Sequence, residues 1–256
     1  MKYKLSVLVP GIRTHNWKKL YDSVGNSTKE SFEIIFVGPY EPPPELQDVE
    51  NVKFVQDYGT PIRCQQIALT LSEGQWVTWA ADDGYYVDNA LDDSFSIIEN
   101  NDDYKTVVFG KYFEGEGNEK VQNDIQYHKL NFHPATKATH IPAEYMSLNC
   151  GVVSRQLLIE LGGWDCSFEV CPMSYADFAI RAQKHGANFI IQENVIFKCG
   201  HMPGVSGDHA PIHYAQITHD EPLFKHIYNS TDSLERVKIK VDNWKSSPNK
   251  WTRRFA

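Results

Sequence analysis

The chain lacks any apolar run that approaches the roughly 20 residues needed to cross a bilayer, so no membrane span is expected. It has five cysteines, an odd number, and no Cys-x-x-Cys pair. A disulfide framework and a cysteine zinc site are therefore not expected. The cysteines instead favour a reducing compartment. The short apolar run near the N-terminus has no small-residue cleavage site after it. It predicts a first strand rather than a signal peptide, and we expect a cytoplasmic protein.

Positive charge is also scarce. Acidic residues outnumber basic ones, 33 to 25, and the formal net charge is −8. This balance argues against a chain-wide surface for nucleic acid or anionic lipid. The last twenty residues are an exception, because six Lys and Arg residues lie around Trp244 and Trp251. Such a tail either binds an anionic acceptor, nucleic acid included, by charge and stacking, or is a solvated surface segment. The second interpretation is favoured.

Apolar segments and helix signals alternate through the first 110 residues. Strands are expected at 4–9, 32–37, 52–55, 76–81 and 106–109, and helices at 16–24 and 61–73. This spacing predicts parallel strands joined by right-handed crossovers. Further on, strands are expected at 188–191 and 195–197, and helices at 155–161 and from Ser174 onward. The predicted fold class is therefore α/β, with a mixed central sheet flanked by helices.

The same pattern suggests a division of the chain. We expect a main domain at 1–205, made of a nucleotide-binding half at 1–110 and an acceptor half at 111–205, followed by a C-terminal extension at 206–256. The polar stretch 114–137 has weak periodicity and indicates a long functional loop.

Two adjacent acids, Asp82 and Asp83, follow the apolar strand predicted at 76–81. In an open α/β sheet, ligands bind at the carboxyl ends of the strands. Two neighbouring carboxylates repel each other unless a cation lies between them, and a divalent cation that carries substrate phosphates is an economical candidate. Asp82-Asp83-Gly84 is equally compatible with a polar turn. On these residues alone, both interpretations stay open.

Five motifs occur in a characteristic order. They are Ser-Val-Leu-Val-Pro at 6–10, Pro-Ile-Arg at 61–63, the strand with its acid pair at 76–83, Leu-Gly-Gly-Trp-Asp at 161–165, and Asp-Phe-Ala-Ile-Arg at 177–181 with a glycine at 186. Over most of residues 3 to 201 the chain therefore resembles glycosyltransferases of the GT-A fold, particularly the family 2-like group.

The resemblance implies transfer of a sugar from a nucleoside diphosphate donor, expected to be a UDP-sugar, to a hydroxyl group of a glycan or another acceptor. It implies a Mn²⁺ or Mg²⁺ cofactor that neutralises the departing diphosphate. The implied metal ligands are Asp82, Asp83 and His201. The implied donor-binding residues are Pro10, Gly11, Arg13, Gly38, Tyr40, Arg63 and Asp82, and the implied acceptor-binding residues are Gly163 and Trp164. His209, His213, His219 and His226 show no ligand grouping, so they are expected at the surface or at a partner contact.

The general base is expected to be Asp177, with Asp165 as the second candidate and Glu169 also considered. A purely structural role competes for Asp177, because Ser174-x-x-Asp177 has capping-box spacing and Asp177 to Arg181 is an i,i+4 pair.

The chain departs from the family pattern at three places. Ala80 stands where the family has the first acid of its metal motif, Gly38-Pro39-Tyr40-Glu41 replaces an Asp-rich turn, and Ser174-Tyr175 replaces an acid pair. These departures keep open a non-catalytic GT-A-like binding or assembly module. A nucleotidyltransferase is a further alternative, but the segment 10–13 lacks the Gly-rich basic loop that would hold a triphosphate.

Overall fold

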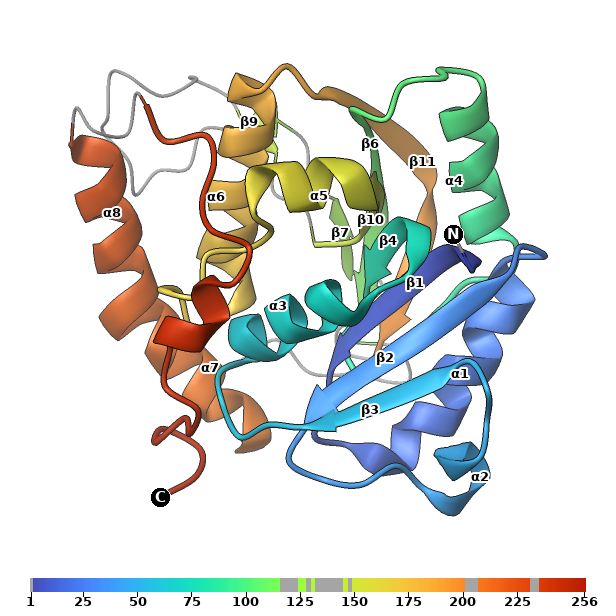
Figure 1. The fold of residues 1–256 in the computed structure, drawn as a ribbon, viewed down its shortest axis with the longest axis horizontal. Helices are drawn as coiled ribbons and strands as arrows, with labels where there is room; N and C mark the ends of the chain where they lie inside the picture. The colour runs from blue at the N-terminus through green and yellow to red at the C-terminus, as the bar shows by residue number, and fades with distance from the viewer. Residues whose placement is uncertain are drawn as a thin grey trace.

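The computed structural model describes residues 2–115, 124–127, 130–131, 145–146, 149–200, 207–230 and 235–256. A central sheet lies between two groups of helices (Figure 1). The first half contains β1 (Tyr3–Pro10), α1 (Thr14–Ser27), β2 (Phe32–Gly38), α2 (Pro44–Gln47), β3 (Val52–Gln56), α3 (Pro61–Leu71), β4 (Gly74–Trp79), β5 (Gly84–Tyr86), α4 (Ala90–Glu99) and β6 (Thr106–Glu114).

The second half contains several short strands, the long strand β11, two helices that pack on the sheet and a C-terminal helical segment. Its elements are β7 (Asp124–Tyr127), β8 (Leu130–Asn131), β9 (Tyr145–Met146), β10 (Gly151–Ser154), α5 (Arg155–Leu161), α6 (Cys171–Lys184), β11 (Asn188–Cys199), η1 (Gly207–His209), α7 (Ala210–Ala215), η2 (Gln216–Asp220), α8 (Glu221–Asn229) and η4 (Asn243–Ser246).

The main sheet has the strand order β3-β2-β1-β4-β10-β6-β11-β5, and β7 pairs with β6. β3, β2, β1 and β4 are parallel. β10 is antiparallel to both β4 and β6, and β5 is antiparallel to β11. The predicted mixed central sheet is confirmed.

Apolar side chains fill both faces of this sheet because successive strand residues point to opposite sides. In β1, Leu8 packs into the core beneath α3, α5 and α6, whereas Val7 and Val9 pack into the core beneath α1 and α4. All three are fully buried. A strand buried on both faces appears as a continuous apolar run in the sequence, and this explains why the strand predicted at 4–9 is confirmed.

Helix starts follow the sequence signals at two places and depart at a third. The Thr60 side chain accepts a hydrogen bond from the Arg63 amide at 3.1 Å and caps α3, and Ser154 caps α5 in the same way. The start predicted at Ser174 is wrong, because α6 begins at Cys171, with Pro172 in its first turn. Ser174 is buried inside the helix and makes no cap, so the proposed capping box does not exist.

The strands predicted at 188–191 and 195–197 form one strand, β11. Its register against β6 shifts between Gln192 and Val195 and again before Phe197. A bulge of this kind interrupts the pattern of apolar residues without ending the pairing, so the sequence suggests two strands where the structure has one.

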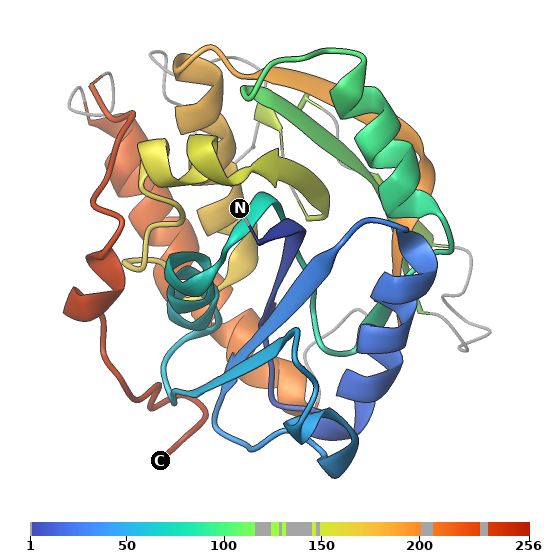
Figure 2. The ribbon, with the colours of Figure 1, turned by 45° about the vertical axis from the view of Figure 1, so that its right-hand side comes forward.

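The C-terminal segment, defined here as residues 207–230 and 235–256, packs on the α3 side of the molecule. Both ribbon views show its red end beside α3 (Figures 1 and 2). The Trp251 amide donates to the Tyr58 carbonyl at 2.7 Å, and the Gln66 side chain donates to the Val241 carbonyl at 2.7 Å. Trp251 is only 4% exposed. The expectation of a solvated tail is therefore wrong for this part of the segment.

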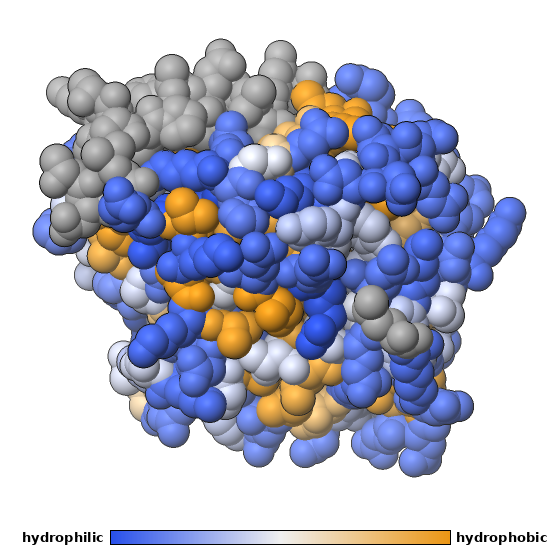
Figure 3. Space-filling model, turned by 45° about the horizontal axis from the view of Figure 1, so that its top comes forward, coloured by the Kyte–Doolittle hydropathy of each residue, from blue (hydrophilic) through white to orange (hydrophobic). Residues whose placement is uncertain are grey.

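Among the described residues, no helix is both long enough and apolar enough to span a membrane. Hydrophilic side chains cover most of the face shown in Figure 3, with smaller apolar groups between them. Scattered apolar side chains of this kind are normal on protein surfaces.

Two glycines give a matched pair for a stability test. A Cβ at Gly38 would lie 1.8 Å from the Gly11 carbonyl oxygen, where the loops after β1 and β2 meet. Gly38→Ala is therefore expected to lower the free energy of unfolding by about 1–3 kcal/mol. Gly25 is exposed on α1 with nothing closer than 3.9 Å, so Gly25→Ala should raise it by roughly 0.5–1 kcal/mol. Urea unfolding of both variants tests the pair, and equal effects would contradict the close approach at Gly38.

Candidate functional site

A cavity of about 410 Å³ opens at the carboxyl ends of β1, β2 and β4. Open α/β sheets bind their ligands at this edge. Gly11 and Gly38 lie on the strand side of the cavity, together with the acid pair that follows β4. The opposite wall comes from the C-terminal segment, which contributes His209 and Arg254 among others. Residues about 200 positions apart in the chain therefore face one another across one pocket.

Asp82 is 2% exposed and holds the loop that follows β1. Its Oδ2 accepts hydrogen bonds from the Ile12 and Arg13 amides, both at 2.5 Å, and lies 3.4 Å from the Trp17 indole nitrogen. Its Oδ1 accepts from Arg13 Nη1 at 2.5 Å. Both carboxylate oxygens are thus engaged by donors of the chain itself, which makes Asp82 the group that positions Arg13.

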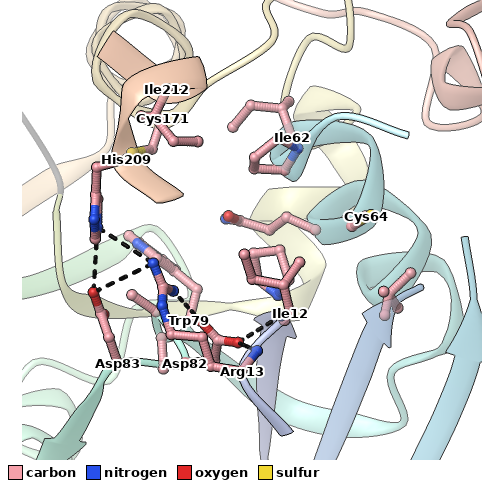
Figure 4. A pocket seen from close by; sticks show the side chains of 18 of the residues that line it. Ile12, Arg13, Ile62, Cys64, Trp79, Asp82, Asp83, Cys171, His209 and Ile212 are labelled. Atoms are coloured by element: carbon pink, nitrogen blue, oxygen red, sulfur yellow. Dashed lines mark hydrogen bonds and ion pairs between the residues drawn. The ribbon is translucent and has the colours of Figure 1, made fainter. Parts of the chain in front are cut away.

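Arg13 lies among carboxylates in the pocket (Figure 4). Besides its contact with Asp82, its Nε donates to Asp208 at 2.7 Å, and its Nη2 lies 4.0 Å from Asp83. Burial alone would lower the pKa of Arg13, but the charges of Asp82 and Asp83 outweigh burial, so the pKa lies above its usual value. Arg13 is therefore a fixed positive charge at the centre of the site.

His209 lies between two carboxylates. Its Nδ1 is 2.9 Å from Asp208 Oδ1, and its Nε2 is 3.4 Å from both Asp83 Oδ2 and Arg13 Nη2. A guanidinium can only donate, so in the neutral ring Nε2 accepts and Nδ1 carries the hydrogen that Asp208 receives. The lone pair of Nε2 is consequently directed at the Arg13 guanidinium, which also lies 4.0 Å from Asp83.

These contacts test the predicted metal site. A histidine whose second ring nitrogen is held by a carboxylate is the usual arrangement of a protein metal ligand, and Asp208 and His209 have it. His209 Nε2 accepts from Arg13 Nη2, which also lies near Asp83, so a metal held by Asp83 and His209 would have to displace this guanidinium nitrogen. Asp82 does not fit, because its oxygens already accept hydrogen bonds. The predicted ligand His201 lies outside the described residues. No group of three or more His, Cys, Asp or Glu side chains that could hold a metal occurs within the described ranges, so a cation here would need substrate phosphates and water as further ligands.

Arg63, a predicted donor-binding residue, is not brought to the pocket. It is 6% exposed and its Nε and Nη2 donate to the Asp57 carboxylate at 3.0–3.1 Å. Its Nη1 donates to the carbonyls of Trp244 and Ser247 in the C-terminal segment. Tyr40, another predicted donor residue, is 52% exposed and does not line the cavity. Pro10, Gly11, Arg13, Gly38 and Asp82 do line it.

The predicted acceptor residues Gly163 and Trp164 belong to the core. Trp164 is fully buried and packs edge-on against Trp79, with ring centroids 5.4 Å apart. Its amide donates to the Gln66 side chain at 2.9 Å. Gly163 has φ +72°, and a Cβ there would lie 2.2 Å from Gln66 Oε1. The Gly-Gly-Trp segment therefore packs α3 against α5 and α6, and the described structure leaves Trp164 no face for a sugar.

Asp177, the predicted base, is also away from the pocket. It is fully buried and accepts hydrogen bonds from Arg181 Nε at 2.8 Å, Tyr228 Oη at 2.7 Å and Arg236 Nε at 2.8 Å. Burial alone would raise the pKa of Asp177, but the two arginines outweigh it and hold the pKa below its usual value. A carboxylate enclosed by three donors stabilises the fold, and Asp177 does not line the pocket.

The second base candidate, Asp165, pairs with Arg236 and accepts hydrogen bonds from the amide and hydroxyl of Ser167. Glu169 accepts from the Trp251 indole and from Arg253. Neither acid lines the cavity. The structure thus places the three base candidates Asp165, Glu169 and Asp177 against arginines of the C-terminal segment and not at the pocket.

Sequence reasoning missed Asp208, His209 and Arg254. His209 was expected at the surface or at a partner contact, because no ligand grouping is visible in the sequence. Its partner Asp83 lies more than 120 positions earlier, and no local spacing links the two. The only signal was the composition of the last twenty residues, with basic residues around two tryptophans, and this stretch includes Arg254 but not Asp208 or His209. That composition left binding of an anionic acceptor as the less favoured interpretation and could not say which side chain reaches the pocket.

Comparison with solved structures finds this architecture in S. aureus TarS. TarS 1-349 in complex with UDP-GlcNAc matches with a TM-score of 0.54 and 19% identity, over 91% of this chain and 72% of that one. The chain has the GT-A fold. TarS 1-349 in complex with UDP matches with a TM-score of 0.52 and 19% identity, over 77% of this chain and 60% of TarS 1-349.

Intact TarS matches with a TM-score of 0.53 and 17% identity, over 93% of this chain and 46% of TarS. This chain therefore spans less than half of TarS, and at such low identity the likeness establishes the fold alone. No protein-family model matches the sequence, and no curated protein matches it.

Proposed function

We propose that this protein is a glycosyltransferase that moves a sugar from a nucleoside diphosphate donor, expected to be UDP-linked, to a hydroxyl group of a glycan or another acceptor. The observation that carries the proposal is the pocket at the carboxyl edge of β1, β2 and β4. In this pocket Asp82 fixes Arg13, and Arg13 faces charged groups of the C-terminal segment. In support, the TarS structures that share the fold include complexes with UDP and with UDP-GlcNAc.

The chain's own residues account for binding and orientation of the donor. Negative charge grows on the diphosphate as the glycosidic bond breaks, and a cation already held in place stabilises that charge without reorganisation. Arg13 meets this requirement because Asp82 and Asp208 hold its guanidinium from two sides. The close contact of Gly11 with Gly38 lets the backbone form the wall beside the diphosphate.

We further propose that Asp83 and His209 hold the Mn²⁺ or Mg²⁺ ion that the resemblance implies. When bound, such an ion acts as a Lewis acid on the phosphate oxygens. Asp208 orients the His209 ring and is its supporting carboxylate. Asp82 acts only by positioning Arg13, which differs from the ligand role expected from the sequence.

Asp83→Asn and His209→Gln are the test of this site. Each is expected to weaken Mn²⁺ binding, measured by electron paramagnetic resonance with UDP present, and to lower hydrolysis of UDP-GlcNAc by roughly 10- to 100-fold. His226, exposed on α8 and outside the pocket, gives the control His226→Gln, which should behave as wild type.

Two results would contradict the proposals separately. Unchanged Mn²⁺ binding in both variants would remove Asp83 and His209 as ligands. No UDP-sugar turnover and no UDP binding by the wild-type protein would overturn the glycosyltransferase assignment. UDP-sugar binding without any turnover would favour the non-catalytic module instead.

A further inference from the structure

Arg254 lines the pocket from the end of the C-terminal segment. Its Nη2 donates to the backbone carbonyl of Asp208 at 2.5 Å, and its guanidinium lies 5.6 Å from the centre of the Trp251 ring. Within the described part of the chain, no carboxylate forms an ion pair with it. The other arginines of this region, Arg63, Arg236 and Arg253, each pair with an acid. Arg254 therefore brings a charge to the pocket that the described residues do not neutralise directly.

Burial and a neighbouring arginine also make the positive charge of Arg254 less favourable. Burial lowers the pKa of Arg254, and the nearby positive charge of Arg13 lowers it again. Asp208 contacts both arginines, Arg13 through its carboxylate and Arg254 through its carbonyl, so the two guanidinium groups lie within reach of one residue. Two cations that share one contact residue would both stabilise an anion able to reach the two of them.

Buried contacts fix the position of Arg254. The neighbouring Trp251 is 4% exposed, its amide donates to Tyr58, and its indole nitrogen donates to Glu169 Oε2 at 2.8 Å. Arg253 Nε donates to the same oxygen of Glu169 at 2.5 Å. Since Trp251 and Arg253, which come shortly before Arg254, are held by these contacts, Arg254 is preorganised and a ligand would not have to order it.

We propose that Arg254 and Arg13 together bind the diphosphate of the donor, so that the C-terminal segment is part of the donor site. This inference rests on the proposed function. A guanidinium offers paired N–H donors that match two phosphate oxygens, and two such groups suit a diphosphate better than a neutral sugar. Asp82 and Asp208 are already paired with Arg13, and a cation at Asp83 and His209 would offset the remaining acid. The pocket then presents positive charge to the phosphates.

The test compares Arg254→Gln, Arg254→Lys and Lys250→Gln with the wild-type protein. UDP binding is measured by calorimetry with Mn²⁺ present, and uridine binding by ligand-observed NMR. Arg254→Gln is expected to raise the Kd for UDP by roughly 10- to 100-fold and to leave uridine binding unchanged. Arg254→Lys, which keeps the charge but loses the paired donors, should fall between. Lys250 is an exposed basic residue of the same tail that does not line the pocket, so Lys250→Gln should stay within about twofold of wild type.

An unchanged Kd for UDP in Arg254→Gln would overturn the inference while leaving the proposed function intact. An equal loss of UDP and uridine binding would also overturn it, because that outcome reports a structural role. Inorganic pyrophosphate separates the remaining cases. Wild type could bind pyrophosphate but not UDP, with pyrophosphate binding lost in Arg254→Gln. That result would support Arg254 as an anion-binding residue and overturn the proposed function. If wild type binds neither ligand, both fail.

Discussion

Asp177→Asn is expected to lower the free energy of unfolding by about 3–5 kcal/mol, because it leaves buried cations without their counter-ion. Arg181 is fully buried, and Arg236 Nε donates to Asp177 from a segment that begins beyond α8. Arg181 also donates to the carbonyls of Leu161 and Gly163. Loss of the Asp177 charge should therefore loosen the junction of α5, α6 and the C-terminal segment. Urea unfolding at pH 7 measures the effect.

The ion pairs of Asp177 also predict that the free energy of unfolding depends on pH. The pKa of Asp177 is lower in the folded protein than in the unfolded chain, where it is about 3.9, so the unfolded state binds a proton more readily. Its stabilising contribution is full above the unfolded pKa and is lost as pH falls through the folded value. The difference in unfolding free energy between wild type and Asp177→Asn should consequently be constant near neutral pH and shrink below roughly pH 4.

Asp165→Asn is the matched control, since Asp165 pairs with the same Arg236 but its side chain is 15% exposed. Partial exposure weakens this ion pair relative to the fully buried one, so the expected loss lies between about 1 and about 3 kcal/mol. A contrary result would be clear. If Asp177→Asn kept wild-type stability while sugar transfer fell by about 100-fold, the size expected for loss of a general base, Asp177 would be the catalytic base that the sequence suggests.

Asp177 shows which contacts can be predicted from the sequence and which cannot. Its i,i+4 spacing to Arg181 is a local signal, and the structure contains that pair. Its other partners, Tyr228 and Arg236, follow 51 and 59 positions later, and nothing in the sequence links them to it. The acidic motif therefore looked the same as a catalytic one, although long-range contacts bury it.

Local signals explain the part of the fold that was predicted. Apolar runs give β1 and β2, Thr60 with Pro61 gives the start of α3, and Gly162 gives the end of α5, with φ +85°. The motif order gave the GT-A resemblance that the structures support. The pocket could be predicted only on its strand side, because its opposite wall comes from the C-terminal segment, whose path depends on tertiary packing.

Arg63→Gln is expected to lower the free energy of unfolding by about as much as Asp177→Asn does. Arg63 and Asp57 have side chains only 8% and 10% exposed, and breaking a buried pair of this kind costs about 3–5 kcal/mol. The substitution also removes donors to the carbonyls of Trp244 and Ser247, which hold the C-terminal segment against α3. Faster hydrogen–deuterium exchange is therefore expected across residues 243–256, together with weaker UDP binding, because the segment carries Arg254.

This mechanism separates a positioning role from direct donor binding. Arg63→Lys keeps a positive charge beside Asp57 but lacks the fork that reaches both the acid and the carbonyls, so it should restore part of the stability and leave exchange in the tail raised. Arg155, also in the first turn of a helix, donates only to Ser72 among the described residues, and Arg155→Gln should change neither quantity by much. Weaker UDP binding in Arg63→Lys with normal exchange across 243–256 would instead mean that Arg63 contacts the donor itself. Faster hydrogen–deuterium exchange across 243–256 together with weaker UDP binding would show that Arg63 affects the pocket indirectly, by holding the C-terminal segment against α3.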